Sequence, residues 1–164
     1  MEKSEYRILL VDDEADVLEF VGYNLKKEGY TVYTAQNGEA AIKQAKEILP
    51  HLTLLDVMMP DMNGFEVCKK LKEERKTKNI PIIFLTAKAD KKSVTKGFSL
   101  GGVDYVTKPF NSLELKARVK THLELKRAKD KLVTKNKKLK KMARIDPLTK
   151  LYNRRYMLDK LEEE

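Results

Sequence analysis

The chain has one cysteine, no tryptophan and no long hydrophobic run, and each absence narrows the class of protein. A single cysteine, Cys68, excludes an internal disulfide and fits a reducing compartment, so we expect a cytoplasmic protein. The longest apolar stretches span four to six residues, whereas a membrane-spanning helix needs about 20, so no membrane partner is expected. The polar first residues, MEKSEYR, show no secretory signal.

The positive charge of the chain is confined to its C-terminal third. The 164 residues carry a net charge of +9 and are 41% hydrophobic, which is enough to build a core. Residues 1–111 contain 17 basic and 17 acidic side chains, whereas residues 112–164 contain 17 and 8. The first part is therefore expected to be a neutral globular domain, and the basic character belongs to the tail.

Short apolar segments alternate with helical patterns along the first 120 residues. Five segments predict strands: Tyr6–Val11, Tyr30–Ala35, Leu52–Asp56, Ile80–Ala87 and Val103–Phe110. Four segments with apolar residues at helical spacing lie between them: 15–27, 37–49, 64–74 and 91–100. A final helix is predicted to begin at Ser112. Five such units predict a parallel sheet with helices on both of its faces.

Polar side chains stand at the carboxyl ends of four of the predicted strands, where burial of an unpaired carboxylate would be costly. They are Asp12 and Asp13 directly after the first strand, Asp56 as the last residue of the third, Thr86 near the end of the fourth and Lys108 near the end of the fifth. The carboxyl ends of parallel strands meet at one edge, and ligands bind there in open sheets of this kind. We therefore expect these side chains to form one site.

The residue types in this set suit the transfer of a phosphoryl group. Close carboxylates repel unless a cation joins them, and oxygen ligands favour Mg²⁺, which also accepts phosphate oxygens. Asp56 is then a candidate nucleophile that forms an aspartyl-phosphate, while Lys108 and Thr86 contact the phosphoryl oxygens. Taken singly, each residue also has a structural interpretation: a helix N-cap pair for Asp12 and Asp13, a turn for Asp56, a plain strand residue for Thr86 and a solvated strand end for Lys108.

Four motifs resemble the receiver domains of bacterial two-component response regulators in order and spacing: ILLVDDE, LTLLDVMMPDMNGFEV, IIFLTA and DYVTKPF. The resemblance implies an α/β, flavodoxin-like, doubly wound five-stranded parallel sheet of order 2-1-3-4-5 over residues 1–125, with an extended C-terminal helix. It makes Asp56 the phosphoacceptor. It makes Asp12 and Asp13 ligands of Mg²⁺ together with Asp56, and adds the backbone carbonyl of Met58.

The same resemblance assigns a switch and partners. It makes Thr86 the switch hydroxyl, Lys108 the phosphate-binding lysine, and Tyr105 the aromatic residue that reorients with Thr86. The implied partners are a sensor histidine kinase or phosphotransfer protein, and a second copy of the chain. The homodimer would form through the fourth helix, fifth strand and final helix, through the stalk described next, or through both. A haloacid-dehalogenase-like phosphatase is the rival, but it places D-x-D-x-T after its first strand, where this chain has DDE.

The tail is predicted to be one long helix, because residues 112–144 contain no Gly or Pro. Leu125, Leu132 and Leu139 are seven residues apart and Asn136 can set the register, as in a two-stranded coiled coil. Residues 126–144 are therefore interpreted as a stalk, with a solvated basic helix as the alternative. The tail is too short for a winged-helix output domain, so specific nucleic-acid binding is not expected. A basic helix could still contact phosphates nonspecifically.

The segment ARIDPLTKLYNRRYMLDKL resembles the opening turn and first helix of GGDEF domains, whose usual pattern is D-x-L-T-G-L-x-N-R-R. The matching residues are Asp146, Leu148, Thr149, Leu151, Asn153, Arg154 and Arg155, while Lys150 replaces the usual Gly. Residues 145–164 are therefore interpreted as the start of a GGDEF domain, and the output as a diguanylate cyclase. The G-G-D/E-E-F signature is absent, so this chain is not expected to be an enzyme. A capped basic helix is the alternative.

Overall fold

The computed structural model describes residues 2–87, 90–144, 148–149, 151 and 154–162. The chain divides into two compact units, residues 1–123 and 124–164. In chain order the elements are a 3-10 helix η1 (Lys3–Glu5), β1 (Arg7–Val11), α1 (Ala15–Lys27), β2 (Thr31–Ala35), α2 (Gly38–Ile48), β3 (Leu52–Asp56), α3 (Gly64–Glu73), β4 (Ile82–Thr86), α4 (Lys91–Ser99), β5 (Asp104–Thr107), α5 (Ser112–Arg144) and α6 (Arg154–Glu162).

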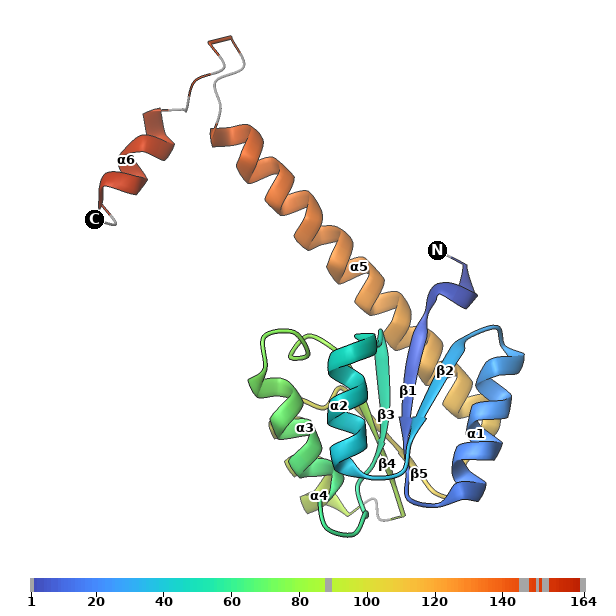
Figure 1. Ribbon diagram of the computed structural model, residues 1–164. Coiled ribbons are helices and arrows are strands. Elements are labelled where there is room, and N and C mark those ends of the chain that lie inside the picture. Colours follow the sequence, from blue (N-terminus) through green and yellow to red (C-terminus); the bar gives the residue numbers. More distant parts are fainter. Residues whose placement is uncertain (1, 88–89, 145–147, 150, 152–153, 163–164) are drawn as a thin grey trace. The chain divides into compact units, whose positions relative to one another are not determined.

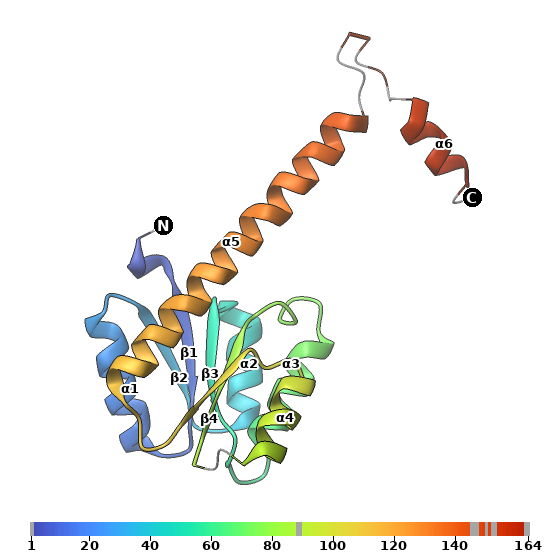
Figure 2. The same ribbon diagram turned by 180° about the vertical axis from the view of Figure 1, so that it is seen from behind.

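The first unit is a five-stranded sheet in the order β2-β1-β3-β4-β5, with every neighbouring pair parallel. Helix α1 and the first turns of α5 cover one face of the sheet, and α2, α3 and α4 cover the other (Figures 1 and 2). The predicted doubly wound fold and its strand order are thus confirmed. This order makes β1 and β3 neighbours at the centre, so the residues that follow them lie side by side.

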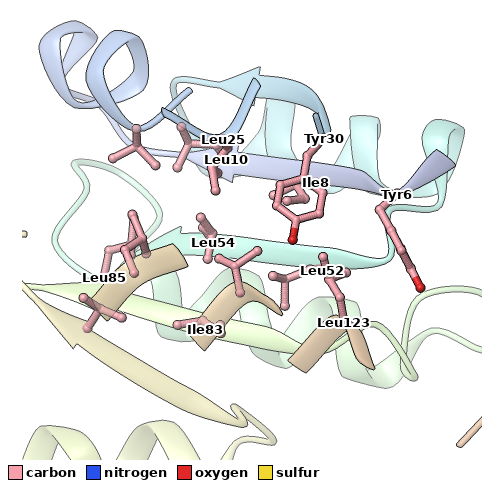
Figure 3. Close-up of a cluster of buried hydrophobic side chains, with 14 of the residues drawn as sticks. Tyr6, Ile8, Leu10, Leu25, Tyr30, Leu52, Leu54, Ile83, Leu85 and Leu123 are labelled. Atoms are coloured by element: carbon pink, nitrogen blue, oxygen red, sulfur yellow. The ribbon is translucent and has the colours of Figure 1, made fainter. Parts of the chain in front are cut away.

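Two hydrophobic cores, one on each face, hold the sheet between its helices. On one face, Leu10, Leu54 and Ile83 pack beneath Leu25 of α1 and Leu123 of α5 (Figure 3). Alternate strand residues supply the opposite core, so the strand β3 is buried along its whole length. Burying a Leu or Ile side chain contributes about 1.5–3 kcal/mol. Strands covered on both faces therefore appear in the sequence as continuous apolar runs.

Side-chain caps begin three of the helices that follow the strands. The side chains of Asn37, Asn63 and Asp90 accept hydrogen bonds from backbone amides in the first turns of α2, α3 and α4. Such caps typically contribute about 1 kcal/mol each. The cap of α3 is followed by Gly64, whose absent Cβ would lie 2.2 Å from the carbonyl oxygen of Asp56. Glycine thus lets α3 begin directly against the end of β3.

Four predicted strands are shorter in the structure, the first two by one residue and the last two by more. The fifth strand was expected over Val103–Phe110 but covers Asp104–Thr107, and the fourth was expected over Ile80–Ala87 but covers Ile82–Thr86. Each of the two segments contains a proline, which has no amide hydrogen for a sheet hydrogen bond. The chain leaves the sheet after Thr107, which carries Lys108 over the carboxyl edge.

The tail contains the long helix that the lack of Gly and Pro predicts. Helix α5 runs without interruption for 33 residues, and α6 covers Arg154–Glu162. No helix among the described residues is long and apolar enough to cross a membrane. Of the residues that carry the GGDEF resemblance, Asp146, Lys150 and Asn153 lie outside the described residues.

Candidate functional site

The sheet places the predicted polar residues at a single edge. Asp12 follows β1, and Asp56 is the last residue of β3, one position beyond the paired Val11 and Leu55. On the next strands, Asp56 pairs with Leu85, so Thr86 comes one residue later. Thr86 pairs with Thr107, the residue before Lys108, so parallel pairing in this register brings all four strand ends to the same level.

Three carboxylates form a cluster at this edge. One oxygen from each of Asp12, Asp13 and Asp56 lies within 4.8 Å of the others. Asp12 is fully buried, Asp56 is 2% exposed, and Asp13 is exposed to solvent. A set of oxygen ligands with one solvent-facing member suits Mg²⁺, which keeps several of its waters. The donor set therefore fits the metal that the sequence predicted.

Lys108 is the positive partner of this cluster. Its Nζ donates a hydrogen bond of 2.7 Å to Oδ2 of Asp12 and lies 3.5 Å from Oδ1 of Asp56. It also lies 3.3 Å from Oε1 of Glu14. The backbone amide of Lys108 donates to the carbonyl of Thr86 at 2.8 Å, which fixes the lysine against β4. One ammonium group therefore faces three carboxylates.

The electrostatics show that one lysine does not balance the cluster. Burial, followed by the nearby charge of Asp12, raises the pKa of Asp56 from its ordinary 3.8 to about 7. The charge of Lys108 and the amide of Met58 act in the opposite direction but do not cancel the rise. Burial opposes the charge on Lys108, yet its hydrogen bond to Asp12 and the charge of Asp56 raise its pKa. The site holds surplus negative charge that a bound cation would stabilise.

The loop after β3 supports Asp56 through its backbone. The amide of Met58 donates to Oδ1 of Asp56 at 3.2 Å, and the amide of Gly64 donates to the carbonyl of Val57 at 2.9 Å. The Met58 side chain is 65% exposed at the rim of the site. The role of the Met58 carbonyl as a metal ligand stays a prediction.

Thr86 and Tyr105 line one hollow between β4, β5 and α4. Thr86 is 5% exposed, and the half-buried Tyr105 ring meets Phe98 edge to face, with ring centroids 6.2 Å apart. Phe84 and Val94 are among the residues that form the apolar wall of this hollow. The predicted switch residues are thus neighbours, in a place where one side chain could move as the other does.

A charged network on β5 and α5 was missed in the sequence. Arg118 donates to both oxygens of Asp104 at 2.7 and 2.8 Å, and Nε2 of His122 lies 3.0 Å from Oδ2 of Asp104. Glu114 pairs with Arg118 one turn away. The spacing of Glu114, Arg118 and His122 at four-residue intervals was the available signal. This network ties the start of β5 to α5.

Comparison with known proteins agrees with this geometry. The response regulator receiver domain family matches residues 8–120. The chain is 45% identical over 117 residues to the alkaline phosphatase synthesis transcriptional regulatory protein PhoP of Bacillus subtilis, covering 71% of this chain and 48% of that protein. It therefore spans about half the length of this curated relative.

Solved structures show the same fold. A putative response regulator from Chloroflexus aurantiacus is 38% identical, with a TM-score of 0.70 over 73% of this chain and 98% of that one. The chemotaxis protein CheY4 of Vibrio cholerae is 30% identical, with a TM-score of 0.69 over 71% and 97%. The chain therefore belongs to the response regulator receiver domain family. Receiver domains are phosphoacceptors of two-component systems that interact with histidine kinases or phosphotransfer proteins.

Proposed function

We propose that Asp56 accepts a phosphoryl group from a phosphohistidine, in a site completed by Mg²⁺ on Asp12, Asp13, Asp56 and the Met58 carbonyl. The observation that carries the proposal is the buried carboxylate cluster, with Lys108 within 3.5 Å of Asp56. An isolated turn aspartate would need neither buried neighbours nor a lysine from a distant part of the chain.

The transfer follows from the positions of the groups. A carboxylate oxygen of Asp56 attacks phosphorus and forms a P–O bond, while the P–N bond to the donor imidazole breaks and its electron pair stays on nitrogen. The Lys108 ammonium lies close enough to Asp56 to contact the phosphoryl oxygens and stabilise their negative charge, and the Thr86 hydroxyl can donate a hydrogen bond to one of them. When bound, Mg²⁺ supplies positive charge to the carboxylates and the phosphoryl oxygens.

Intact-mass spectrometry with acetyl phosphate and Mg²⁺ tests the acceptor. The wild-type chain should gain the mass of one phosphoryl group, and Asp56→Asn should gain none. Asp13→Ala should react more slowly through weaker metal binding. Asp61→Asn is the matched control, because Asp61 is an exposed aspartate of the following loop. Equal phosphorylation of Asp56→Asn and wild type would show that the acceptor lies elsewhere.

The signal leaves the site through Thr86 and Tyr105. As the Thr86 hydroxyl moves toward the phosphoryl group, Tyr105 can fill the vacated part of their shared hollow. This changes the surface formed by α4, β5 and the start of α5, where Phe98 is 47% and Val103 39% exposed. A new charge needs only a differential affinity of a few kcal/mol to shift such a two-state element.

Pairing of two chains is the proposed response. Leu125, Leu132 and Leu139 of α5 are exposed and lie at heptad spacing along this helix. Beryllofluoride, a mimic of the phosphoryl group, should shift the chain toward a dimer or rearrange one in sedimentation velocity. Thr86→Ala should reduce this response, and Leu132→Lys should weaken pairing while leaving phosphorylation intact. An unchanged sedimentation profile with Asp56 fully occupied would refute the coupling.

The proposed output domain is a diguanylate cyclase. Its support is the motif from Asp146 to Arg155, whose last two residues begin the helix α6 (Arg154–Glu162). The relative PhoP is named a transcriptional regulator, which makes a DNA-binding output the second candidate. The coding sequence after Glu164 decides between them: a G-G-D/E-E-F signature supports the cyclase, and a winged-helix domain contradicts it.

A further inference from the structure

The stalk segment, residues 126–144 of α5, has an extreme charge composition. It contains ten Lys or Arg residues and one acidic residue, Asp130. The Asp130 carboxylate is already engaged, because it lies 2.9 Å from Nζ of Lys126 one turn earlier. Residues 127–144 are all exposed, so the basic side chains face solvent. The segment is a strongly cationic rod about 28 Å long, at about 1.5 Å per residue.

This pattern is unfavourable for a helix in water alone. Arg127, Lys131, Lys135 and Lys138 follow one another at spacings of three or four residues, which places like charges next to each other. Such pairs destabilise a helix, whereas a merely solvated helix usually alternates acidic and basic residues. An anionic partner would relieve this repulsion along the whole segment.

The distribution of side chains indicates which anion fits. Basic residues surround the helix except for the narrow stripe of Leu125, Leu132 and Leu139, and the stalk segment contains no aromatic residue. A helix that lies on a membrane needs a broad apolar face, often with aromatic residues. A duplex carries one phosphate charge per about 1.7 Å, which a rod with a positive charge about every 3 Å can follow. The segment therefore suits a linear polyanion better than a lipid surface.

We propose that the stalk segment binds the phosphate backbone of duplex nucleic acid without reading its sequence. Eight of its ten basic residues are lysines, which contact phosphates as point charges. Base recognition relies instead on bidentate contacts from Arg, Asn or Gln in a groove. This surface is distinct from the phosphoacceptor site, and the proposal does not depend on phosphorylation of Asp56.

The binding should depend steeply on salt. If about five phosphates are contacted, the logarithm of affinity falls with the logarithm of salt concentration at a slope of about −4.5. Affinity should then drop about 500-fold between about 50 and 200 mM NaCl. Fluorescence anisotropy of a labelled random-sequence duplex of about 20 base pairs, titrated with the 164-residue chain, measures this directly.

Two variants with equal change of net charge locate the binding surface. The stalk variant carries Gln in place of Arg127, Lys131, Lys135 and Lys138, since Gln preserves helix propensity. The matched control carries Gln in place of four exposed lysines of the receiver unit, Lys43, Lys69, Lys76 and Lys92. The stalk variant should lose at least about tenfold in affinity and reduce the slope by about 3 to 4, while the control stays near wild type.

Leu132→Lys provides a test that does not remove any basic residue. It adds a charge to the stalk segment and should bind the duplex at least as tightly as wild type. Equal losses in the stalk variant and the control, weaker binding by Leu132→Lys, or no wild-type binding at about 50 mM NaCl would each overturn the proposal. Tighter binding to vesicles containing phosphatidylserine than to the duplex would overturn it in favour of a membrane surface.

Discussion

Replacing Asp56 by Asn should stabilise the metal-free protein, by an amount that grows with pH. The Asp56 carboxylate is 2% exposed and lies beside Asp12, and its pKa is raised from 3.8 to about 7. The folded state therefore disfavours the charged form. At about 1.4 kcal/mol per pKa unit, the difference corresponds to a penalty of about 4 kcal/mol when Asp56 is fully ionised. Asn resembles the protonated acid in shape and never carries this penalty.

The direction of the pH dependence follows from proton binding. Between pH 3.8 and about 7 the folded state holds a proton on Asp56 that the unfolded state has released, so wild-type stability falls as pH rises. The Asp56→Asn variant has no carboxylate at this position, so its stability does not fall with pH for this reason. The variant should exceed wild type by about 1.6 kcal/mol at pH 5 and about 4 kcal/mol at pH 8.

Urea unfolding followed by circular dichroism, with a chelator present, measures both differences. Contributions from the other ionisable groups largely cancel between the two proteins, and Asp61→Asn controls for the loss of an exposed carboxylate. Adding Mg²⁺ at pH 8 should narrow the gap, because a cation that binds only the folded wild-type cluster stabilises it. A gap that is the same at pH 5 and pH 8, or an Asn variant less stable than wild type at pH 8, would refute this reasoning.

Four further substitutions give distinct expectations. Thr53→Val should raise the free energy of unfolding by about 1 kcal/mol, because the buried Thr53 hydroxyl has no hydrogen-bond partner within the described part of the chain. Thr77→Val should lower it by about 1–2 kcal/mol, because the Thr77 hydroxyl donates at 2.7 Å to a carbonyl of α3. Urea unfolding of the two variants should therefore give changes of opposite sign in the free energy of unfolding. Gly64→Ala should lower stability by at least about 3 kcal/mol, since its Cβ would overlap the carbonyl group of Asp56, and a calorimetric melting temperature within a few degrees of wild type would contradict this. Lys108→Met should raise the pKa of Asp56 further, because the lysine charge lowers it. A carboxyl ¹³C NMR titration without metal measures this pKa, and an unchanged or lower value in the variant would contradict the expectation.

The sequence by itself determined the order of the elements and the location of the site. Apolar runs between capped helices predicted β3 as Leu52–Asp56, the same bounds that the structure has. Asn37 and Gly64 marked helix starts through interactions within a few residues, which sequence patterns report well. The strand ends of β1, β3, β4 and β5 were therefore identifiable before their distances were known. The resemblance to a known family supplied the strand order and the roles of the residues.

Only the tertiary structure decided how these residues act on one another. Lys108 and Asp12 are 96 residues apart in the chain, yet they form a contact of 2.7 Å. The contact exists because only β3 separates β1 from β4 in the sheet, and because the chain turns over the edge of the sheet after β5. The raised pKa of Asp56 depends on burial, which no local pattern specifies. The bond from Arg118 to Asp104 likewise joins a helix to a strand through the fold. Distances and burial arise from packing between remote segments, so the strengths of these interactions belong to the fold rather than to any single stretch of sequence.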